Sequence, residues 1–208
     1  MKLVVLGANG RTGKLVLQVA LDRGMDVTAV VRSAGKQPCT RHDRLISRVG
    51  DPCNPTFLKS VLPGHDVVIS ALGGRSPTKM ATSVYCRSAS AIVEAACDTG
   101  LNRVLVTSTA LLFPPRTLPE RILQFVVPNV VRSATRMEEI LKESDLNWTF
   151  ARCGFLNDDE EAKYRAQKDS LPSKGTSVSR LALAHFLVDA TENSDARCSV
   201  FGVSNPKT

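Results

Sequence analysis

The stretch LVVLGANGRTG, residues 3–13, decides the fold of this 208-residue chain. The apolar run from Leu3 to Leu6 predicts a β-strand, and residues 12–23 follow with helical periodicity. A strand that turns into a helix through closely spaced glycines leaves backbone N–H groups unpaired at the positive end of the helix dipole. Pyrophosphate binds at such an end, so the stretch predicts a dinucleotide-binding turn.

Each glycine of the turn has a separate expected task. Gly7 permits the tight turn, Gly10 lets a phosphate approach the backbone without meeting a Cβ, and Gly13 lets the helix lie close to the sheet. The spacing is G-x-x-G-x-x-G rather than G-x-G-x-x-G, and the alternative is a purely structural glycine turn. The position between a strand and a helix favours nucleotide binding.

The end of the second predicted strand, residues 26–31, indicates which dinucleotide binds. A protein that prefers NAD would carry Asp or Glu there to bind the ribose 2′-hydroxyl. Arg32 stands there instead, and its guanidinium suits a 2′-phosphate, which Arg11 could reach from the other side. We therefore expect NADP(H) in preference to NAD(H). The alternative is that both arginines are solvated surface charges.

Composition is typical of a single compact domain, with 43% hydrophobic and 23% charged residues. The strand at the start of the sequence leaves no room for a cleavable signal, and no apolar stretch has the length of a membrane span. We therefore expect a cytoplasmic protein with no membrane partner, as a monomer or a homodimer.

The net charge of +7 comes from dispersed basic residues, and aromatic residues make up only 5% of the chain. Nucleic-acid-binding proteins usually gather basic residues in runs or on one helix face, so we expect no nucleic-acid partner. The charge fits acidic small molecules better. The six cysteines contain no C-x-x-C pair and no histidine pair has metal-binding spacing, so we expect free thiols and no metal site.

Strands and helices alternate along the rest of the chain. This alternation is typical of a doubly wound α/β protein, in which right-handed crossovers build one parallel sheet with helices on both faces. We expect a single Rossmann-fold domain over residues 1–208. The expected strands are residues 26–31, 45–49, 66–70, 103–107, 147–152 and 199–203, and the later helices are residues 55–62, 80–99, 132–144 and 179–192.

Ligands of such sheets bind beyond the carboxyl ends of the strands. Asp51 follows the third strand, where its carboxylate could accept a hydrogen bond from the adenine amino group, and glycines after the fourth strand let backbone pass close to the ribose and nicotinamide. Ser108 follows the fifth strand, either beside the nicotinamide or as a cap of the strand end. Cys153 and Gly154 follow the sixth as the expected floor for the carboxamide end.

The chain resembles the atypical short-chain dehydrogenases/reductases. The segments that carry this resemblance are the glycine turn, Arg32, Gly50-Asp51, Leu72-Gly73, Thr107-Ser108 and residues 138–156. Within that group it is most similar to NAD(P)H-binding, NmrA-like proteins, above all the flavin reductase/biliverdin reductase B type. The resemblance implies that Ser108 lies beside the nicotinamide and the acceptor, as the candidate catalytic residue. With the residues after the sixth strand, the expected cofactor-binding set is Gly7, Asn9, Gly10, Arg11, Thr12, Gly13, Arg32, Asp51, Leu72, Gly73, Ser108, Cys153 and Gly154.

The chain also departs from this group. Typical short-chain dehydrogenases use a Tyr-x-x-x-Lys pair as general acid, but neither Tyr85 nor Tyr164 has a lysine four residues later, and Val130 and Ala134 stand where the pair would be. Members commonly carry a proline around Cys153, and the bilin-reducing type a histidine. This chain has neither, which argues against bilin reduction.

A site without this acid suits a flat conjugated acceptor, which spreads the charge of an arriving hydride over its ring and takes a proton from water. We expect an NADPH-dependent reductase of a flavin, a quinone or a similar acceptor, held by loops 109–131 and 153–178. The alternative is a non-catalytic NADP(H)-sensing regulator of the NmrA-like type. The expected apolar walls are Leu111, Leu112, Phe113, Pro114, Pro115, Phe125 and Phe155, and the expected basic rim is Arg75, Lys79, Arg116 and Arg121.

Overall fold

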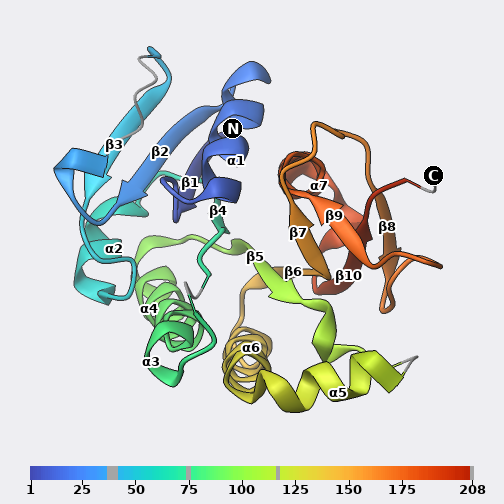
Figure 1. The fold of residues 1–208 in the computed structure, drawn as a ribbon. Helices are drawn as coiled ribbons and strands as arrows, with labels where there is room; N and C mark the ends of the chain where they lie inside the picture. The colour runs from blue at the N-terminus through green and yellow to red at the C-terminus, as the bar shows by residue number, and fades with distance from the viewer. Residues whose placement is uncertain (37–41, 74–75, 116–117, 207–208) are drawn as a thin grey trace.

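A computed structural model describes residues 1–36, 42–73, 76–115 and 118–206. Strands and helices alternate along them as the sequence predicts, in a doubly wound α/β fold (Figure 1). The strands are β1 (Lys2–Leu6), β2 (Asp26–Val31), β3 (Leu45–Val49), β4 (Val67–Ser70), β5 (Arg103–Thr109), β6 (Asn147–Cys153), β7 (Phe155–Asn157), β8 (Arg165–Lys168), β9 (Ser177–Ser179) and β10 (Ser199–Ser204). The helices are α1 (Arg11–Asp22), α2 (Pro55–Val61), α3 (Lys79–Thr82), α4 (Val84–Thr99), α5 (Leu118–Val126), α6 (Pro128–Lys142) and α7 (Arg180–Glu192), with 3-10 turns η1 (Ala34–Lys36), η2 (Ala110–Leu112) and η3 (Ser194–Ala196).

The main sheet has the strand order β3-β2-β1-β4-β5-β6-β10-β8. The chain runs from β1 outward through β2 to β3, then returns to place β4 on the other side of β1. The strand order therefore reverses between β1 and β4. In open α/β sheets, ligands bind in the crevice outside the carboxyl ends of the strands at such a reversal, so the topology points to the end of β1, where the glycine turn lies.

One edge of the sheet differs from the wholly parallel sheet that the sequence predicts. β8 pairs antiparallel with β10, and β7 pairs with β9 in a separate two-stranded sheet. β8 consists of Arg-Ala-Gln-Lys and is mostly exposed, so it lacks the apolar alternation that marks a strand in sequence. Main-chain pairing with β10, rather than burial, holds it in place.

The helix predictions need three corrections. Residues 79–99 form two helices, α3 and α4, because the hydroxyls of Thr82 and Ser83 donate to backbone carbonyls at the junction and compete with regular helical bonding. α6 begins at Pro128, a residue suited to the first helical turn, rather than at residue 132. The segment 109–131, expected as a loop, contains η2, α5 and the start of α6. Likewise, 153–178 contains β7, β8 and part of β9.

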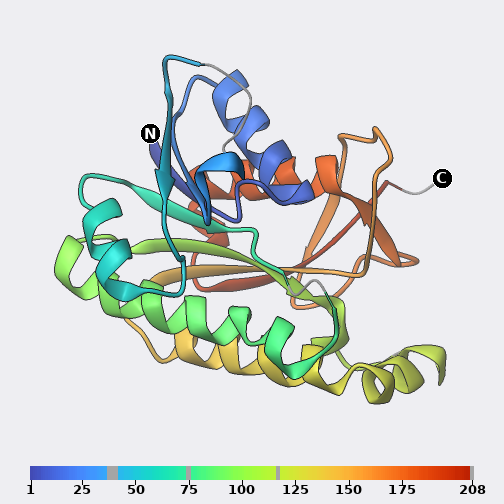
Figure 2. The ribbon, with the colours of Figure 1, turned by 60° about the vertical axis from the view of Figure 1, so that its left-hand side comes forward.

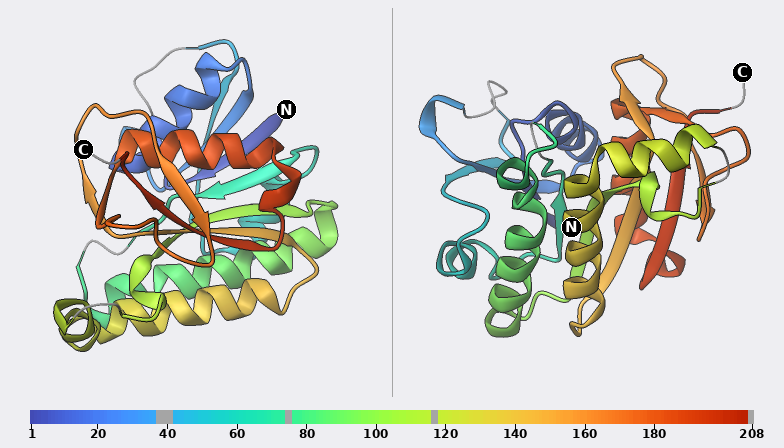
Figure 3. Two further views of the ribbon diagram at one scale, coloured as in Figure 1. Left: turned by 90° about the vertical axis from the view of Figure 1, so that its right-hand side faces the viewer. Right: turned by 60° about the horizontal axis from the view of Figure 1, so that its bottom comes forward.

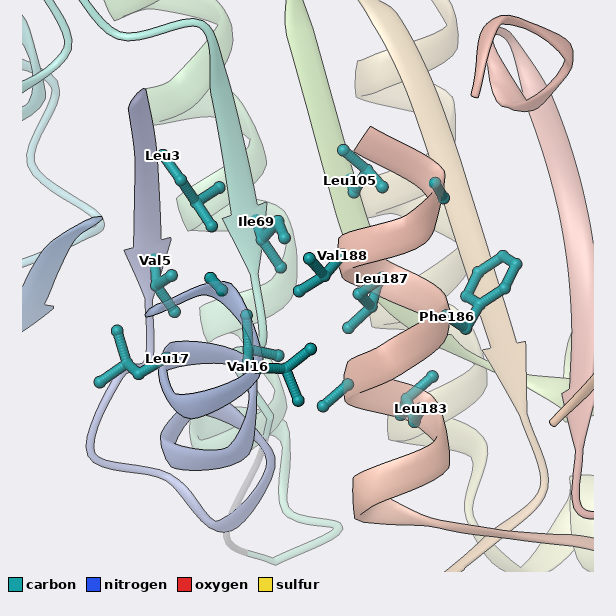
Figure 4. Packing of buried hydrophobic residues seen from close by; sticks show 14 of the residues in the cluster. Leu3, Val5, Val16, Leu17, Ile69, Leu105, Leu183, Phe186, Leu187 and Val188 are labelled. Atoms are coloured by element: carbon teal, nitrogen blue, oxygen red, sulfur yellow. The ribbon is translucent and has the colours of Figure 1, made fainter. Parts of the chain in front are cut away.

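Helices cover both faces of the sheet. α1 and α7 pack on one face, and α2, α4 and α6 on the other (Figure 2 and Figure 3). Figure 4 shows Val16 of α1 and Val188 of α7 packed with Leu3 and Ile69 of the central strands. All four side chains are fully buried, and each contributes roughly 1.5–3 kcal/mol by its burial. This packing fixes where the strand ends, and hence the site, lie.

None of the helices in the described ranges is long and apolar enough to cross a membrane.

Candidate cofactor site

A cavity of about 500 Å³ lies at the carboxyl ends of β1, β2 and β4. Seven of the expected cofactor residues line it, with α3 and the start of α4 as the opposite wall. Its shape and position therefore bring together most of the site that the sequence predicts. The expected residues that line it are Gly7, Asn9, Gly10, Arg32, Asp51, Leu72 and Gly73.

The glycine turn has the geometry that its spacing predicts. Gly7 has φ +79°, a conformation that residues with a Cβ rarely adopt. A Cβ on Gly13 would lie 2.1 Å from the Gly7 carbonyl oxygen, so α1 starts in direct contact with the turn. Gly10 is the N-cap of α1, and no side chain caps this helix end. Among the described residues other than its chain neighbours, a Cβ on Gly10 would meet only the Gly7 carbonyl oxygen, at the close distance of 3.1 Å. Because Gly10 lines the cavity, a larger side chain would take up space there.

Among the described residues, two arginines line the cavity. Arg32 follows β2 as expected, and Arg87 comes from α4, where nothing in the sequence marks it as a ligand. Arg87 Nη2 lies 3.8 Å from Asp51 Oδ2, and both side chains are more than half exposed. Asp51 Oδ1 also accepts the backbone N–H of Cys53 at 2.9 Å. Burial and the neighbouring Asp51 carboxylate raise the pKa of the Cys53 thiol to about 11.

Arg11 does not take the expected position. Its Nη1 lies 3.1 Å from Asp158 Oδ2, beyond β7, and the residue does not line the cavity. Asp158 also accepts a hydrogen bond through Oδ1 from Nη1 of the buried Arg180 at 2.6 Å. In this structure Arg11 therefore does not face Arg32 across the cavity, and its expected contact with the 2′-phosphate stays a prediction. Arg87 is the second guanidinium at the cavity wall.

Ser108 lies in a buried polar network beyond the cavity lining. Its Oγ donates to Glu138 Oε1 at 2.7 Å, and Arg152 binds the same carboxylate through Nε at 2.9 Å and Nη2 at 2.6 Å. Arg152 Nη1 also donates to the Leu112 carbonyl, and its guanidinium covers the Phe113 ring at 4.7 Å. The sequence does not reveal Glu138 and Arg152 as partners, because they are 14 residues apart on α6 and β6. The network commits the serine proton to Glu138.

Cys153 and Gly154 have structural tasks in this conformation. The Cys153 thiol is buried and donates to the Ser108 carbonyl at 3.3 Å, and burial raises its pKa to about 12. A Cβ on Gly154 would lie 2.2 Å from the Thr176 carbonyl oxygen. Gly154 thus permits a close backbone crossing, and a bulky residue there would displace backbone rather than only block an acceptor.

The other expected residues are more dispersed. Thr12 is nearly buried at the start of α1. Phe113 is also buried and offers little surface, whereas Phe125 and Phe155 are largely exposed. The remaining members of the expected rim, Lys79 and Arg121, are exposed, and Arg75 and Arg116 lie outside the described residues.

Neither tyrosine stands on α6, where the missing Tyr-x-x-x-Lys pair would be. Tyr164 donates to Asp189 at 2.6 Å, on the side of α7. Tyr85 belongs to α4, and its hydroxyl would lie 3.8 Å from a Cβ on Gly73, a feature that the sequence did not indicate. On α6, Ala134 is buried where the pair would stand. Among the described residues, no group of three or more His, Cys, Asp or Glu side chains is arranged to hold a metal ion.

A protein family described as NAD(P)H-binding matches residues 7–194, which include the glycine turn and the strands of the main sheet other than β1 and β10. The chain belongs to the NAD(P)H-binding family. The photosystem II assembly factor Ycf39 of Cyanophora paradoxa is a curated relative, 32% identical over 159 residues, which are 75% of this chain and 46% of that protein. This NAD(P)H-binding chain spans about half the length of the curated relatives it matches.

Solved structures share the fold of this NAD(P)H-binding protein. A short-chain dehydrogenase/reductase of Veillonella parvula in complex with NADP superposes with a TM-score of 0.80 at 24% identity, covering 100% of this chain and 95% of that one. The anaerobilin reductase ChuY of Escherichia coli O157:H7 superposes with a TM-score of 0.80 at 19% identity, covering 100% and 98%. At these identities the likeness establishes the Rossmann fold and not the reaction.

Proposed function

We propose that this NAD(P)H-binding protein is an NADPH-dependent reductase that passes hydride to a flat conjugated acceptor of the flavin or quinone class. The observation that carries the proposal is the cavity in which the glycine turn and two arginines meet. The uncapped start of α1 suits the pyrophosphate, and Arg32 and Arg87 suit the 2′-phosphate that distinguishes NADPH from NADH.

The engagement of Ser108 supports the choice of acceptor. The Ser108 proton is engaged by Glu138, and Arg152 holds that carboxylate in two hydrogen bonds. Reduction of a ketone would need an acid at the developing alkoxide, whereas a flavin or quinone delocalises the charge and takes its proton from water. In this mechanism the bound cofactor supplies the hydride. The protein orients the acceptor against it and excludes competing reactions.

A panel of acceptors tests the proposal. NADPH oxidation is measured with a flavin, a quinone and dichloroindophenol, and the parent protein should turn over at least one of them. The Gly10→Val variant is the matched control, because it should keep the fold and lose the cofactor. Turnover that persists in this variant would place the reaction elsewhere and refute the proposal.

A second candidate function is NADP(H) sensing without turnover. The engaged Ser108 proton and the curated relatives named as assembly factors favour it. In this function, cofactor occupancy changes an interface with a partner, as the sequence resemblance to NmrA-like regulators implies. Tight NADPH binding with no oxidation by any acceptor of the panel would select this function over the reductase.

A further inference from the structure

Helix α5 presents its apolar side to the outside of the protein. Leu118, Ile122, Phe125 and Val126 are between 54% and 78% exposed, and their spacing places them on one face of the helix. None of the residues of α5 is buried. The helix lies at the margin of the molecule, next to the N-terminal end of α6 (Figure 2). We call these four side chains the α5 patch.

A polar residue attaches the opposite side of α5 to the body. Gln124 Nε2 donates to the Leu111 carbonyl at 2.8 Å and to the Phe113 carbonyl at 3.4 Å. Gln124 therefore faces the protein while Phe125 and Val126 face outward, the reverse of an ordinary surface helix. An exposed apolar face that is held in this orientation is typical of a site that contacts a membrane or another protein.

Two basic residues of the described chain lie near the α5 patch. In the sequence, residues 114–136 contain four arginines and a single acidic residue, Glu120, and Arg136 pairs with Glu139. Arg121 is exposed beside the patch, and Arg132 is exposed on the adjoining α6. An apolar helix face with basic neighbours suits an anionic lipid surface, where the side chains enter the acyl boundary and the arginines meet the headgroups.

The size of the α5 patch argues against a second copy of this chain as its occupant. The four side chains expose roughly 500 Å² in total, given about 150–250 Å² for a whole aromatic residue. A standard protein interface buries about 800 Å² on each partner. Two copies would also bring identical arginines together. A bilayer requires neither a minimum contact area nor a complementary shape.

From these observations we infer that the α5 patch docks the protein on an anionic membrane surface. The inference does not depend on the reaction proposed above. It revises the sequence-based expectation of no membrane partner, because that expectation concerned spanning segments, whereas α5 would lie within the interface plane.

Vesicle flotation of the full chain tests the inference. At low salt, the parent protein should bind vesicles of phosphatidylcholine mixed with phosphatidylglycerol. Its binding to vesicles of pure phosphatidylcholine should be at least tenfold weaker. The Ile122→Ser/Val126→Ser variant should lose at least tenfold in binding to the anionic vesicles. Ile46→Ser/Val49→Ser is the matched control, because it removes two exposed apolar side chains from β3 and should bind as the parent does.

Each variant is first checked for an unchanged dissociation constant for NADPH, which reports an intact fold. A Phe125→Trp variant then provides a second readout, and its fluorescence should shift to shorter wavelength on anionic vesicles as the ring leaves water. The inference fails if the parent does not float with either vesicle, or if the Ile122→Ser/Val126→Ser variant binds as tightly as the parent. It also fails if the parent is a dimer that this variant dissociates while vesicle binding is unchanged.

Discussion

Replacement of Arg32 by serine should weaken NADPH binding and spare NADH binding. Arg32 lines the cavity directly after β2, where the 2′-phosphate of NADPH is expected. A hydrogen bond to an ionised group contributes about 1.5–3 kcal/mol. Arg32 is exposed, so solvent screens the pair and the lower half of this range applies. We expect a loss of about 1.5–2 kcal/mol, or roughly twelvefold to thirtyfold in the dissociation constant.

Arg87→Ser should cost less, about threefold to tenfold, because Arg87 already interacts with Asp51 at 3.8 Å and must share its charge. Titration calorimetry at low and moderate salt measures both variants with NADPH and NADH. Lys168→Ser removes one positive charge from the exposed strand β8, away from the cavity, and is the matched control. If Arg32→Ser weakens NADPH and NADH equally, or changes neither, the assignment of the 2′-phosphate to this end of the cavity is refuted.

Four further outcomes are expected. Gly10→Val should abolish NADPH binding with little change in thermal stability. Gly13→Val should destabilise the fold by about 3 kcal/mol or more, because its Cβ would meet the Gly7 carbonyl. Denaturant unfolding compares the two variants, and equal stability would contradict the assigned task of Gly13. Ser108→Ala should lower turnover with a flavin or quinone by no more than roughly tenfold, and a thousandfold loss in steady-state rate would make the serine an essential proton donor. Gly154→Trp should reduce the yield of folded protein rather than only turnover, because of the Thr176 carbonyl, and a stable variant that binds NADPH but lacks turnover would restore Gly154 to the acceptor face. Cys53 should react slowly with iodoacetamide at pH 8 and faster as the pH approaches its raised pKa of about 11. Bound NADPH should slow the reaction further, and peptide mapping measures this with the exposed Cys97 as the reference. If NADPH gives Cys53 no protection, the cavity is not the cofactor site.

The sequence by itself determined the class of fold and the glycine turn at the centre of the candidate cofactor site. The run Leu3 to Leu6, the turn from Gly7 to Gly13 and the alternation of elements are local patterns, and each reflects backbone chemistry that a few neighbouring residues settle. The position of Arg32 could also be predicted, because it directly follows a recognisable strand that must pair beside β1. Strand β8 could not, since its exposed Arg-Ala-Gln-Lys carries no apolar signal.

Only the tertiary structure decided which distant residues share a space. Arg87 reaches the cavity because α4 packs against the sheet beside β4, and Glu138 meets Ser108 because α6 crosses beneath β5. The need for Gly154 depends on the approach of Thr176, and the turn of Arg11 away from the cavity depends on Asp158. The outward orientation of the apolar face of α5 was also decided by the tertiary structure. A periodic apolar pattern predicts a helix, but it does not tell which face of the helix packs against the rest of the protein. Such contacts join residues tens of positions apart, so their partners are set by the path of the chain through space and not by local pattern.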